Sequence, residues 1–207
     1  MPNMKKIIVS ITVLMLAAII VAGQARPKAD RDAYLKDAKK YSSDITRHPD
    51  DPDAYILRAR AYRSLGRQED AIADLTKAIG LSKHPYYVAQ ATTNRGEIYL
   101  ELGEYSTAEA DFSAVIELEG ALPYKPRAYL GRARSLRSAD RRADAQKDAD
   151  EAIRLYSAMK GPSAKKRLGV AYALRASIRC ADGNSKLASD DAAKAATLGS
   201  PVQNCEK

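Results

Sequence analysis

The sequence is poor in the side chains that build catalytic and metal sites. It has no tryptophan, one phenylalanine, two histidines and two cysteines. His48 and His84 each precede a proline, and neither has carboxylates or thiolates at the spacing that a metal site needs. The sequence also lacks a glycine-rich phosphate loop and a nucleophile elbow. We therefore expect no metal, no cofactor and no enzymatic activity.

The chain likewise lacks any sustained alternation of β-branched residues, so no strand is expected. Alanine is abundant beside Arg, Asp, Glu, Lys and Leu, a composition that favours helices. With 45% hydrophobic and 29% charged residues, the balance is that of a globular rather than a disordered chain. The composition predicts an all-α domain of ordinary size.

Residues 1–25 differ in kind from the rest of the chain. Lys5 and Lys6 precede an apolar run from Ile7 to Ala22, and small residues at Gly23 and Ala25 suit a cleavage site. This layout is typical of a secretory signal peptide. The run is short for a bilayer span, but an uncleaved anchor over residues 7–22 is the alternative. Either way we expect an exported protein: periplasmic or secreted, or anchored in the inner membrane and facing the periplasm.

The two cysteines are Cys180 and Cys205. In an exported chain this even count permits one disulfide between them. Such a bridge would close a loop of about 25 residues and contribute roughly 3 kcal/mol of stability.

The charge balance is basic, with a formal net charge of +8. Outside the cytoplasm a basic surface suits an acidic protein, membrane head groups or an anionic envelope polymer. The alternative is that the charge only keeps the protein soluble. No nucleic-acid partner is expected for an exported chain.

The strongest pattern is an internal repeat at a spacing of 37 residues, with a fourth copy 43 residues after the third. The six extra residues fall around Lys160 to Ser163, where we expect a loop insertion. The columns are Arg58, Arg95, Arg132 and Arg175; Ala71, Ala108, Ala145 and Ala188; and Asp74, Asp111, Asp148 and Asp191. Self-similarity at such a period predicts stacked copies of one structural unit.

Each copy has two helical halves separated by a turn. In the first copy, Tyr55, Ala59 and Tyr62 share one helix face, and Leu65-Gly66 ends that helix. A second helix then places alanines and large apolar residues on one face. One hairpin cannot bury its apolar faces alone, so the copies are expected to stack.

This pattern resembles the tetratricopeptide-repeat (TPR) family. The first copy reads Tyr55, Arg58-Ala59, Tyr62, Gly66, Ala71, Leu75, Ala78, and the second reads Thr92, Arg95-Gly96, Tyr99, Gly103, Ala108, Phe112, Val115. The third is degenerate, with Leu136 and Asp140 at the tyrosine and glycine positions. The resemblance implies an α-solenoid of stacked antiparallel helix hairpins that forms a right-handed superhelix.

The resemblance also divides the chain into units. After the leader, residues 29–49 are expected to form an N-terminal capping helix. The repeats are expected at 53–86, 89–122, 126–159 and 167–202, followed by a tail at 203–207. Within the acidic turn before the first repeat, Asp50, Asp51 and Asp53 lack the glycine and distant glutamate of a calcium loop. We expect a solvated turn and helix N-cap there.

Every copy pairs an arginine in its first helix with an aspartate in its second. The pairs are Arg58 with Asp74, Arg95 with Asp111, Arg132 with Asp148, and Arg175 with Asp191. Identical chemistry in every repeat favours a structural role over a ligand array. We expect bidentate ion pairs that fix the register of each hairpin.

By the resemblance, the first helices line a concave groove that binds a protein or peptide. The polar residues expected there are Arg60, Arg63, Asn94, Glu97, Arg127, Arg134 and Arg137. The neighbouring expected positions are Ile56, Thr93, Leu100, Leu130, Ala173, Ser177 and Cys180. Arginines among small and apolar positions suit an extended or acidic peptide. The alternative is that these arginines are only solvated.

Some TPR proteins hold a C-terminal carboxylate with a Lys/Asn/Asn/Lys/Arg set. Asn94 and Arg127 match two of these positions, whereas Ile56, Arg60 and Gly131 depart from the others. That specificity is therefore not expected.

The leading functional hypothesis is an exported scaffold for protein–protein interaction. Two alternatives remain: a membrane-tethered structural subunit of a cell-envelope complex, and a binder of an anionic envelope polymer.

Overall fold

The computed structural model describes residues 28–200, and this part of the chain consists of helices joined by short turns, with no strand. The helices are α2 (Lys28–Arg47), α3 (Pro52–Ser64), α4 (Gln68–Leu81), α5 (Pro85–Leu102), α6 (Tyr105–Glu117), α7 (Lys125–Ser138), α8 (Arg142–Ala158), α9 (Pro162–Ala181) and α10 (Ser185–Thr197). The all-α prediction is confirmed. The expected leader at 1–25, Cys205 and the tail at 203–207 lie outside the described residues. No helix within 28–200 is long and apolar enough to cross a membrane.

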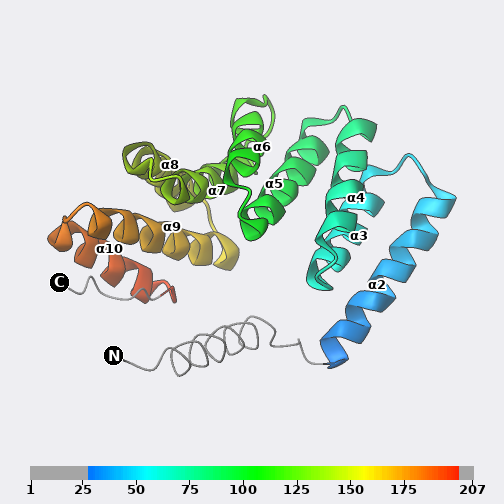
Figure 1. Ribbon diagram of the computed structural model, residues 1–207, viewed down its shortest axis with the longest axis horizontal. Helices are drawn as coiled ribbons and strands as arrows, with labels where there is room; N and C mark the ends of the chain where they lie inside the picture. Colours follow the sequence, from blue (N-terminus) through cyan, green and yellow to red (C-terminus); the bar gives the residue numbers. More distant parts are fainter. Residues whose placement is uncertain (1–27, 201–207) are drawn as a thin grey trace, which may run out of the picture.

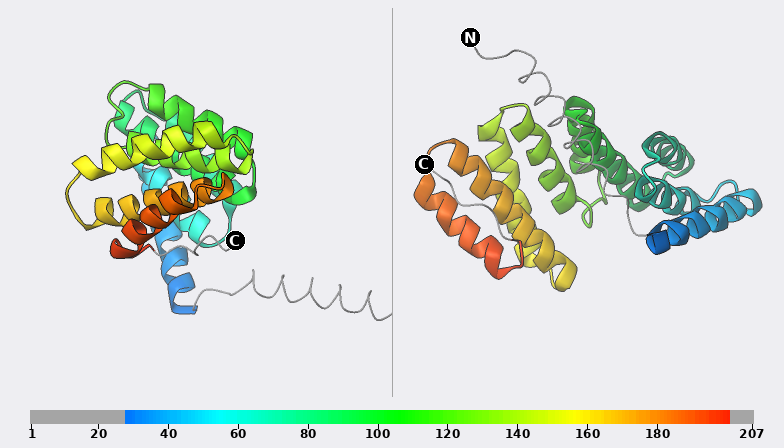
Figure 2. Two further views of the ribbon diagram at one scale, coloured as in Figure 1. Left: turned by 90° about the vertical axis from the view of Figure 1, so that its left-hand side faces the viewer. Right: turned by 60° about the horizontal axis from the view of Figure 1, so that its bottom comes forward.

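The helices stack in chain order into a curved array, which Figures 1 and 2 show from three sides. The first helices of the hairpins, α3, α5, α7 and α9, contact one another in succession. Within residues 28–200, the second helices of successive hairpins make no such contacts. The first helices therefore line the inner, concave side of the curve. The capping helix α2 packs on α3. In the same way, the second helix of each hairpin packs on the first helix of the next hairpin.

Each of the four hairpin turns contains one residue in the left-handed conformation, at the same position of the turn. Gly66, Gly103 and Gly183 have φ between 77° and 79°, and Asp140 occupies the equivalent position of the third hairpin with φ 58°. In each turn the amide of the following residue donates to a carbonyl five residues back, as Arg67 N does to Tyr62 O at 2.9 Å. This closure ends each first helix and reverses the chain, and glycine is favoured because it has no Cβ to clash at positive φ.

Prolines start the first helices. Asp51 caps α3 by accepting from Asp53 N at 3.0 Å, and Pro52 follows it. His84 caps α5 in the same way, with Nδ1 accepting from Tyr86 N at 3.2 Å. A proline is favoured there because its missing N–H would have no partner in the first turn.

The expected loop insertion around Lys160 to Ser163 takes a different form. Only residues 159–161 separate α8 from α9, so most of the extra residues lengthen these two helices, which have 17 and 20 residues. Pro162 begins α9 five residues before the expected repeat at 167–202. The physical reason is that proline at the first helical position favours a helix start.

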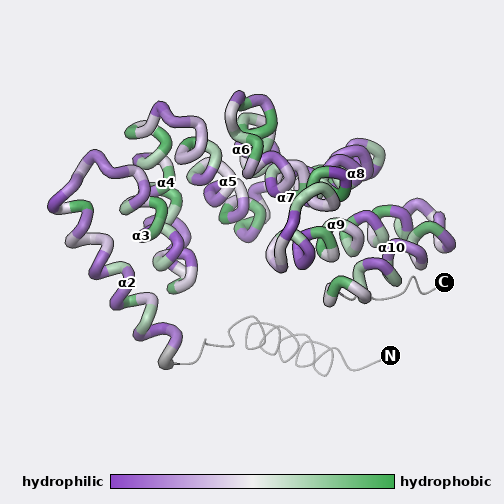
Figure 3. Tube along the Cα trace, turned by 180° about the vertical axis from the view of Figure 1, so that it is seen from behind, coloured by the Kyte–Doolittle hydropathy of each residue, from purple (hydrophilic) through white to green (hydrophobic). Residues whose placement is uncertain are grey.

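Hydrophobic and hydrophilic residues are interspersed along the helices (Figure 3). The small residues of the repeat, Ala71, Ala108, Ala145 and Ala188, are at most 2% exposed. Larger side chains such as Ile56, Leu75 and Phe112 fill the spaces beside them. The apolar residues form a continuous series of clusters between neighbouring hairpins, so each hairpin depends on the next for its burial.

Candidate partner-binding groove

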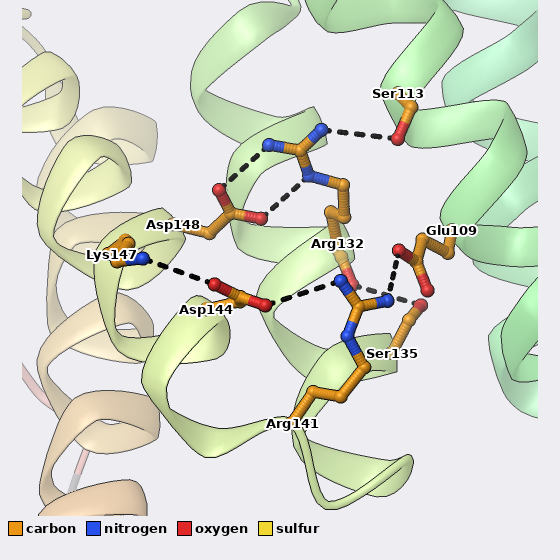
Figure 4. Close-up of polar contacts among 9 residues, drawn as sticks. Glu109, Ser113, Arg132, Ser135, Arg141, Asp144, Lys147 and Asp148 are labelled. Atoms are coloured by element: carbon orange, nitrogen blue, oxygen red, sulfur yellow. Dashed lines mark hydrogen bonds and ion pairs between the residues drawn. The ribbon is translucent and has the colours of Figure 1, made fainter.

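The structure joins all four predicted Arg–Asp pairs as bidentate ion pairs across their hairpins. In the third hairpin, Arg132 Nε lies 2.7 Å from Asp148 Oδ2 and Nη2 lies 2.9 Å from Oδ1 (Figure 4). Each aspartate is almost fully buried. The other three pairs have distances between 2.6 and 2.9 Å. This geometry holds the two helices of each hairpin in register.

Each of these arginines also makes a hydrogen bond to a third helix. We did not predict this contact from the sequence. The remaining Nη1 donates to the second helix of the preceding unit, as Arg132 does to Ser113 Oγ at 3.1 Å (Figure 4). The acceptors are Ser42, Thr76, Ser113 and Asp150. These acceptors are 34, 37 and 37 residues apart, close to the repeat spacing, so the sequence could have shown them as a further repeated polar position. The arginines thus connect successive hairpins and belong to the scaffold.

Four of the seven predicted groove residues bond to one another across three first helices. Glu97 of α5 accepts from Arg63 of α3 at 2.9 Å and from Arg127 of α7 at 2.5 Å. Arg127 Nη2 also donates to Asn94 Oδ1 at 2.8 Å, and Arg63 Nη2 donates to Glu101 Oε1 at 2.5 Å. We call this set (Arg63, Asn94, Glu97, Glu101 and Arg127) the groove network.

The groove network is electrically balanced, and Glu97 at its centre is largely shielded from solvent. The Glu97 side chain is 18% exposed. Its burial opposes ionisation, but the two guanidinium groups outweigh that effect and hold the pKa of Glu97 at about 2. Two arginines and two glutamates neutralise each other in this set, so it contributes no net charge to the groove.

The other three predicted groove residues are not paired with carboxylates. Within residues 28–200, Arg60 and Arg134 have no acidic group within ion-pair distance, and Arg137 donates to the neutral Ser177 Oγ at 2.7 Å. All three are exposed. These arginines therefore contribute net positive charge along the first helices.

Four of the seven neighbouring positions expected in the groove are buried, with Leu130 at 6% and Leu100 at 9% exposure beside Ile56 and Thr93. Ile56 and Thr93 are both 0% exposed, so the expectation that they face the groove is wrong. Ile56 belongs to the core cluster between the first two hairpins, and the Thr93 hydroxyl donates to Ala89 O at 2.7 Å within its own helix. Ile56 shares its core cluster with Ala91 and Ile98 of α5, so packing between the first two hairpins buries it.

Two hollows lie along the first helices. The first, of about 220 Å³, lies between α2 and α3 and is lined by Tyr34, Asp37, Tyr41, Leu57, Arg60, Ala61 and Ser64. The second, of about 100 Å³, lies among α5, α7 and α9 and is lined by Glu97, Arg127, Leu130, Gly131, Arg134, Arg167 and Val170. We call the second one the central hollow. Arg60 lines the first hollow and Arg134 and Arg167 line the second, and among the described residues none of the three has a carboxylate within ion-pair distance.

Two further sequence expectations concern metal and disulfide chemistry. In the described part of the chain, no group of three His, Cys, Asp or Glu side chains is placed to hold a metal ion. Cys180 lies near the end of α9, whereas Cys205 lies outside the described residues. The Cys180–Cys205 bridge stays a prediction.

Comparison with known proteins identifies the repeat. Family models of the tetratricopeptide repeat match residues 52–85 and residues 93–163. Tetratricopeptide repeat protein 13 of Homo sapiens is 38% identical over 79 residues, which are 38% of this chain and 9% of that protein. The chain therefore matches only a small part of that relative's length.

Solved structures share the fold. A chain of the APC/C hetero-tetramer Cut9-Hcn1 has a TM-score of 0.70 at 17% identity, covering 81% of this chain and 30% of that one. MamA has a TM-score of 0.63 at 18% identity, with 83% and 92% covered. PilF of Pseudomonas aeruginosa has a TM-score of 0.63 at 17% identity, with 84% and 78% covered. The predicted α-solenoid of stacked helix hairpins is confirmed, and at these identities the likeness concerns the fold alone.

Proposed function

We propose that this tetratricopeptide-repeat protein is an exported scaffold that binds a peptide or protein partner along its concave side. The observation that carries the proposal is the charge on the first helices. Arg60, Arg134 and Arg137 are exposed there without carboxylate partners, whereas the groove network neutralises its own charges. Because arginine donates charge-assisted hydrogen bonds, such a surface suits an acidic segment of a partner.

The solenoid also supports a scaffolding role. Its first helices form an extended surface, and its core is made of structural alanines, apolar side chains and interhelical ion pairs. Such a surface can hold an extended peptide by side-chain contacts at several repeats. Export rests on the signal-like residues 1–25, with their basic start and apolar run.

The binding proposal is tested with a partner captured from cells by the full chain. Replacing Arg60, Arg134 and Arg137 together by alanine should weaken that partner's affinity at least tenfold. The matched control replaces Lys77, Lys147 and Lys186, which are exposed on the second helices, and removes the same charge. Equal affinity of both triple variants and the unchanged protein would contradict groove binding.

The same variants separate the proposal from polymer binding. If the protein bound an anionic polymer through overall charge, both triple variants would lose affinity equally and binding would fall steeply with salt. A loss confined to the arginine variant favours a partner in the groove.

Export is tested by cell fractionation and mass measurement of the full-length product. A soluble periplasmic species starting near Arg26 is expected. A membrane-bound species of full mass would favour the tethered subunit, with residues 7–22 as the anchor.

A further inference from the structure

The central hollow has a distinct chemical character within the groove. It adjoins the groove network, which contributes Glu97 and Arg127 to its lining, and Arg134 of α7 and Arg167 of α9 line its other side. Within residues 28–200, neither guanidinium has a carboxylate within ion-pair distance. Glu97, the acidic residue that lines the hollow, uses its two oxygens for Arg63 and Arg127. The hollow therefore carries two positive charges that the described protein does not neutralise.

A buried hydroxyl adjoins the same place. Tyr156 of α8 is 4% exposed, and its hydroxyl has the Arg167 side chain as a hydrogen-bonding neighbour. It packs in the same core cluster as Leu130, which lines the hollow. Burial raises the pKa of Tyr156 while Arg167 and Arg127 oppose that rise, which shows that the hydroxyl lies within electrostatic reach of both arginines. The Tyr156 hydroxyl can therefore orient the Arg167 guanidinium beside the hollow.

The size and the walls of the hollow restrict the ligand. Its volume of about 100 Å³ is enough for several ordered waters or for one small polar group. A carboxylate with one or two methylene groups fits this volume. Leu130 and Val170 supply apolar contacts for methylene groups beside the arginines.

We propose that the central hollow binds the side-chain carboxylate of a glutamate or aspartate in the partner, between Arg134 and Arg167. This proposal rests on the proposed function and specifies the chemistry of one subsite. It differs from the positions that bind a C-terminal carboxylate in other TPR proteins, because Asn94 and Arg127 are occupied in the groove network. The acidic residue of the partner would therefore contact the last two repeats.

The test uses the full chain labelled with ¹⁵N and a capped pentapeptide with one glutamate flanked by alanines. Resonances from Leu130 to Arg134 and from Arg167 to Val170, with the arginine Nε–H groups, should shift and saturate during titration. The same peptide with glutamine in place of glutamate should cause no saturable shift. Shifts spread over all basic residues, or identical shifts with both peptides, would overturn the proposal.

Matched variants sharpen the result. Arg134→Gln and Arg167→Gln should each lower the affinity for the glutamate peptide at least about tenfold, since each variant loses a charge-assisted hydrogen bond. Lys165→Gln removes the same charge from an exposed position of α9 that does not line the hollow, and affinity should change less than twofold. An equal effect of all three variants would overturn a defined carboxylate site. Unchanged thermal unfolding of the variants would show that they fold normally.

Inorganic phosphate serves as the second probe. A carboxylate site predicts weaker or less localised shifts with phosphate than with the glutamate peptide at equal concentration. Localised saturation by phosphate alone would overturn the carboxylate assignment.

The two proposals can fail separately. If the peptide does not bind but the Arg60, Arg134 and Arg137 triple variant loses its captured partner, the groove function stands and the carboxylate subsite fails. If the peptide binds in the hollow but the triple variant keeps its partner, partner binding in the groove fails.

Discussion

Gly131 of α7 lies directly against the ring of Phe112 in α6. A Cβ atom added to Gly131 would lie 2.4 Å from Phe112 Cζ, a distance that real Cβ contacts do not reach. Phe112 is fully buried and also contacts the Cβ position of Gly96 in its own hairpin. The two glycines therefore make room for the one phenylalanine of the chain, and this relationship holds the second hairpin against the third.

Gly131→Ala should destabilise the protein by about 1–3 kcal/mol, because the well-packed Phe112 ring must move. Chemical denaturation would measure the loss. Gly80→Ala is the control, since α4 has open space at Gly80 and alanine favours the helix by about 0.5–1 kcal/mol. Phe112→Leu should reduce the cost of Gly131→Ala, and a cost that is the same in both backgrounds would contradict the steric explanation.

Asp140→Gly should stabilise the protein by about 0.5–1 kcal/mol. Asp140 has φ 58°, and the equivalent turn residues in the other hairpins are glycines with φ near 78°. Relief of the left-handed strain should exceed both the flexibility added to the unfolded chain and the loss of the exposed ion pair with Arg142. Thermal unfolding would measure the gain.

The control for this turn is Asp182→Gly in the fourth hairpin. Asp182 has φ −88°, so glycine relieves no strain there and should lower stability. A similar gain from both substitutions would mean that the sign of φ at Asp140 is not the cause.

Repetition explains which features could be predicted from the sequence. Arg132 and Asp148 occupy columns that recur in every copy, and each pair is 16 residues apart, which the structure converts into facing positions of a hairpin. The fold and these pairs follow from local helix periodicity and from the need of each hairpin to bury its face. Both requirements act identically in each repeat.

The groove network could not be predicted in the same way. Arg63, Glu97 and Arg127 occupy three different positions of the repeat, so no column marks them as a set. Their contact depends on how far the superhelix turns between α3, α5 and α7. The burial of Ile56 likewise depends on packing between the first two hairpins. Properties that depend on curvature are set by many contacts between hairpins and leave no short sequence signal.

Arg132→Lys should destabilise the protein by about 1–2 kcal/mol although the charge is kept. A lysine has one ammonium group and cannot make both bonds to Asp148 while also reaching Ser113. Calorimetric unfolding would measure the effect. Arg154→Lys is the control. The Arg154 side chain is 66% exposed, so its ion pair with Glu151 should contribute little to stability. Equal stability of Arg132→Lys and the unchanged protein would contradict the three-helix role of this arginine.

The free energy of unfolding should depend on pH through the ionisation of Glu97. Its pKa is about 2 in the folded protein, below the ordinary value of 4.5 that applies when the chain unfolds. Because the folded value is the lower one, the stabilisation is fully present above about pH 4.5 and is lost as pH falls toward 2. The difference corresponds to a stabilisation on the order of 3 kcal/mol at neutral pH.

Comparison of the unchanged protein with Glu97→Gln isolates this contribution from the other carboxylates. The difference in the free energy of unfolding between the two should be largest at pH 7 and should shrink progressively between pH 4.5 and pH 2, as measured by urea denaturation. Glu117→Gln, on the exposed face of α6, is the matched control and should show a small difference at every pH. A difference for Glu97→Gln that does not change with pH would mean that the two arginines do not stabilise its ionised form. The groove network would then hold α3, α5 and α7 together by packing. Glu97 could no longer be counted as neutralising the charge of Arg63 and Arg127 in the groove.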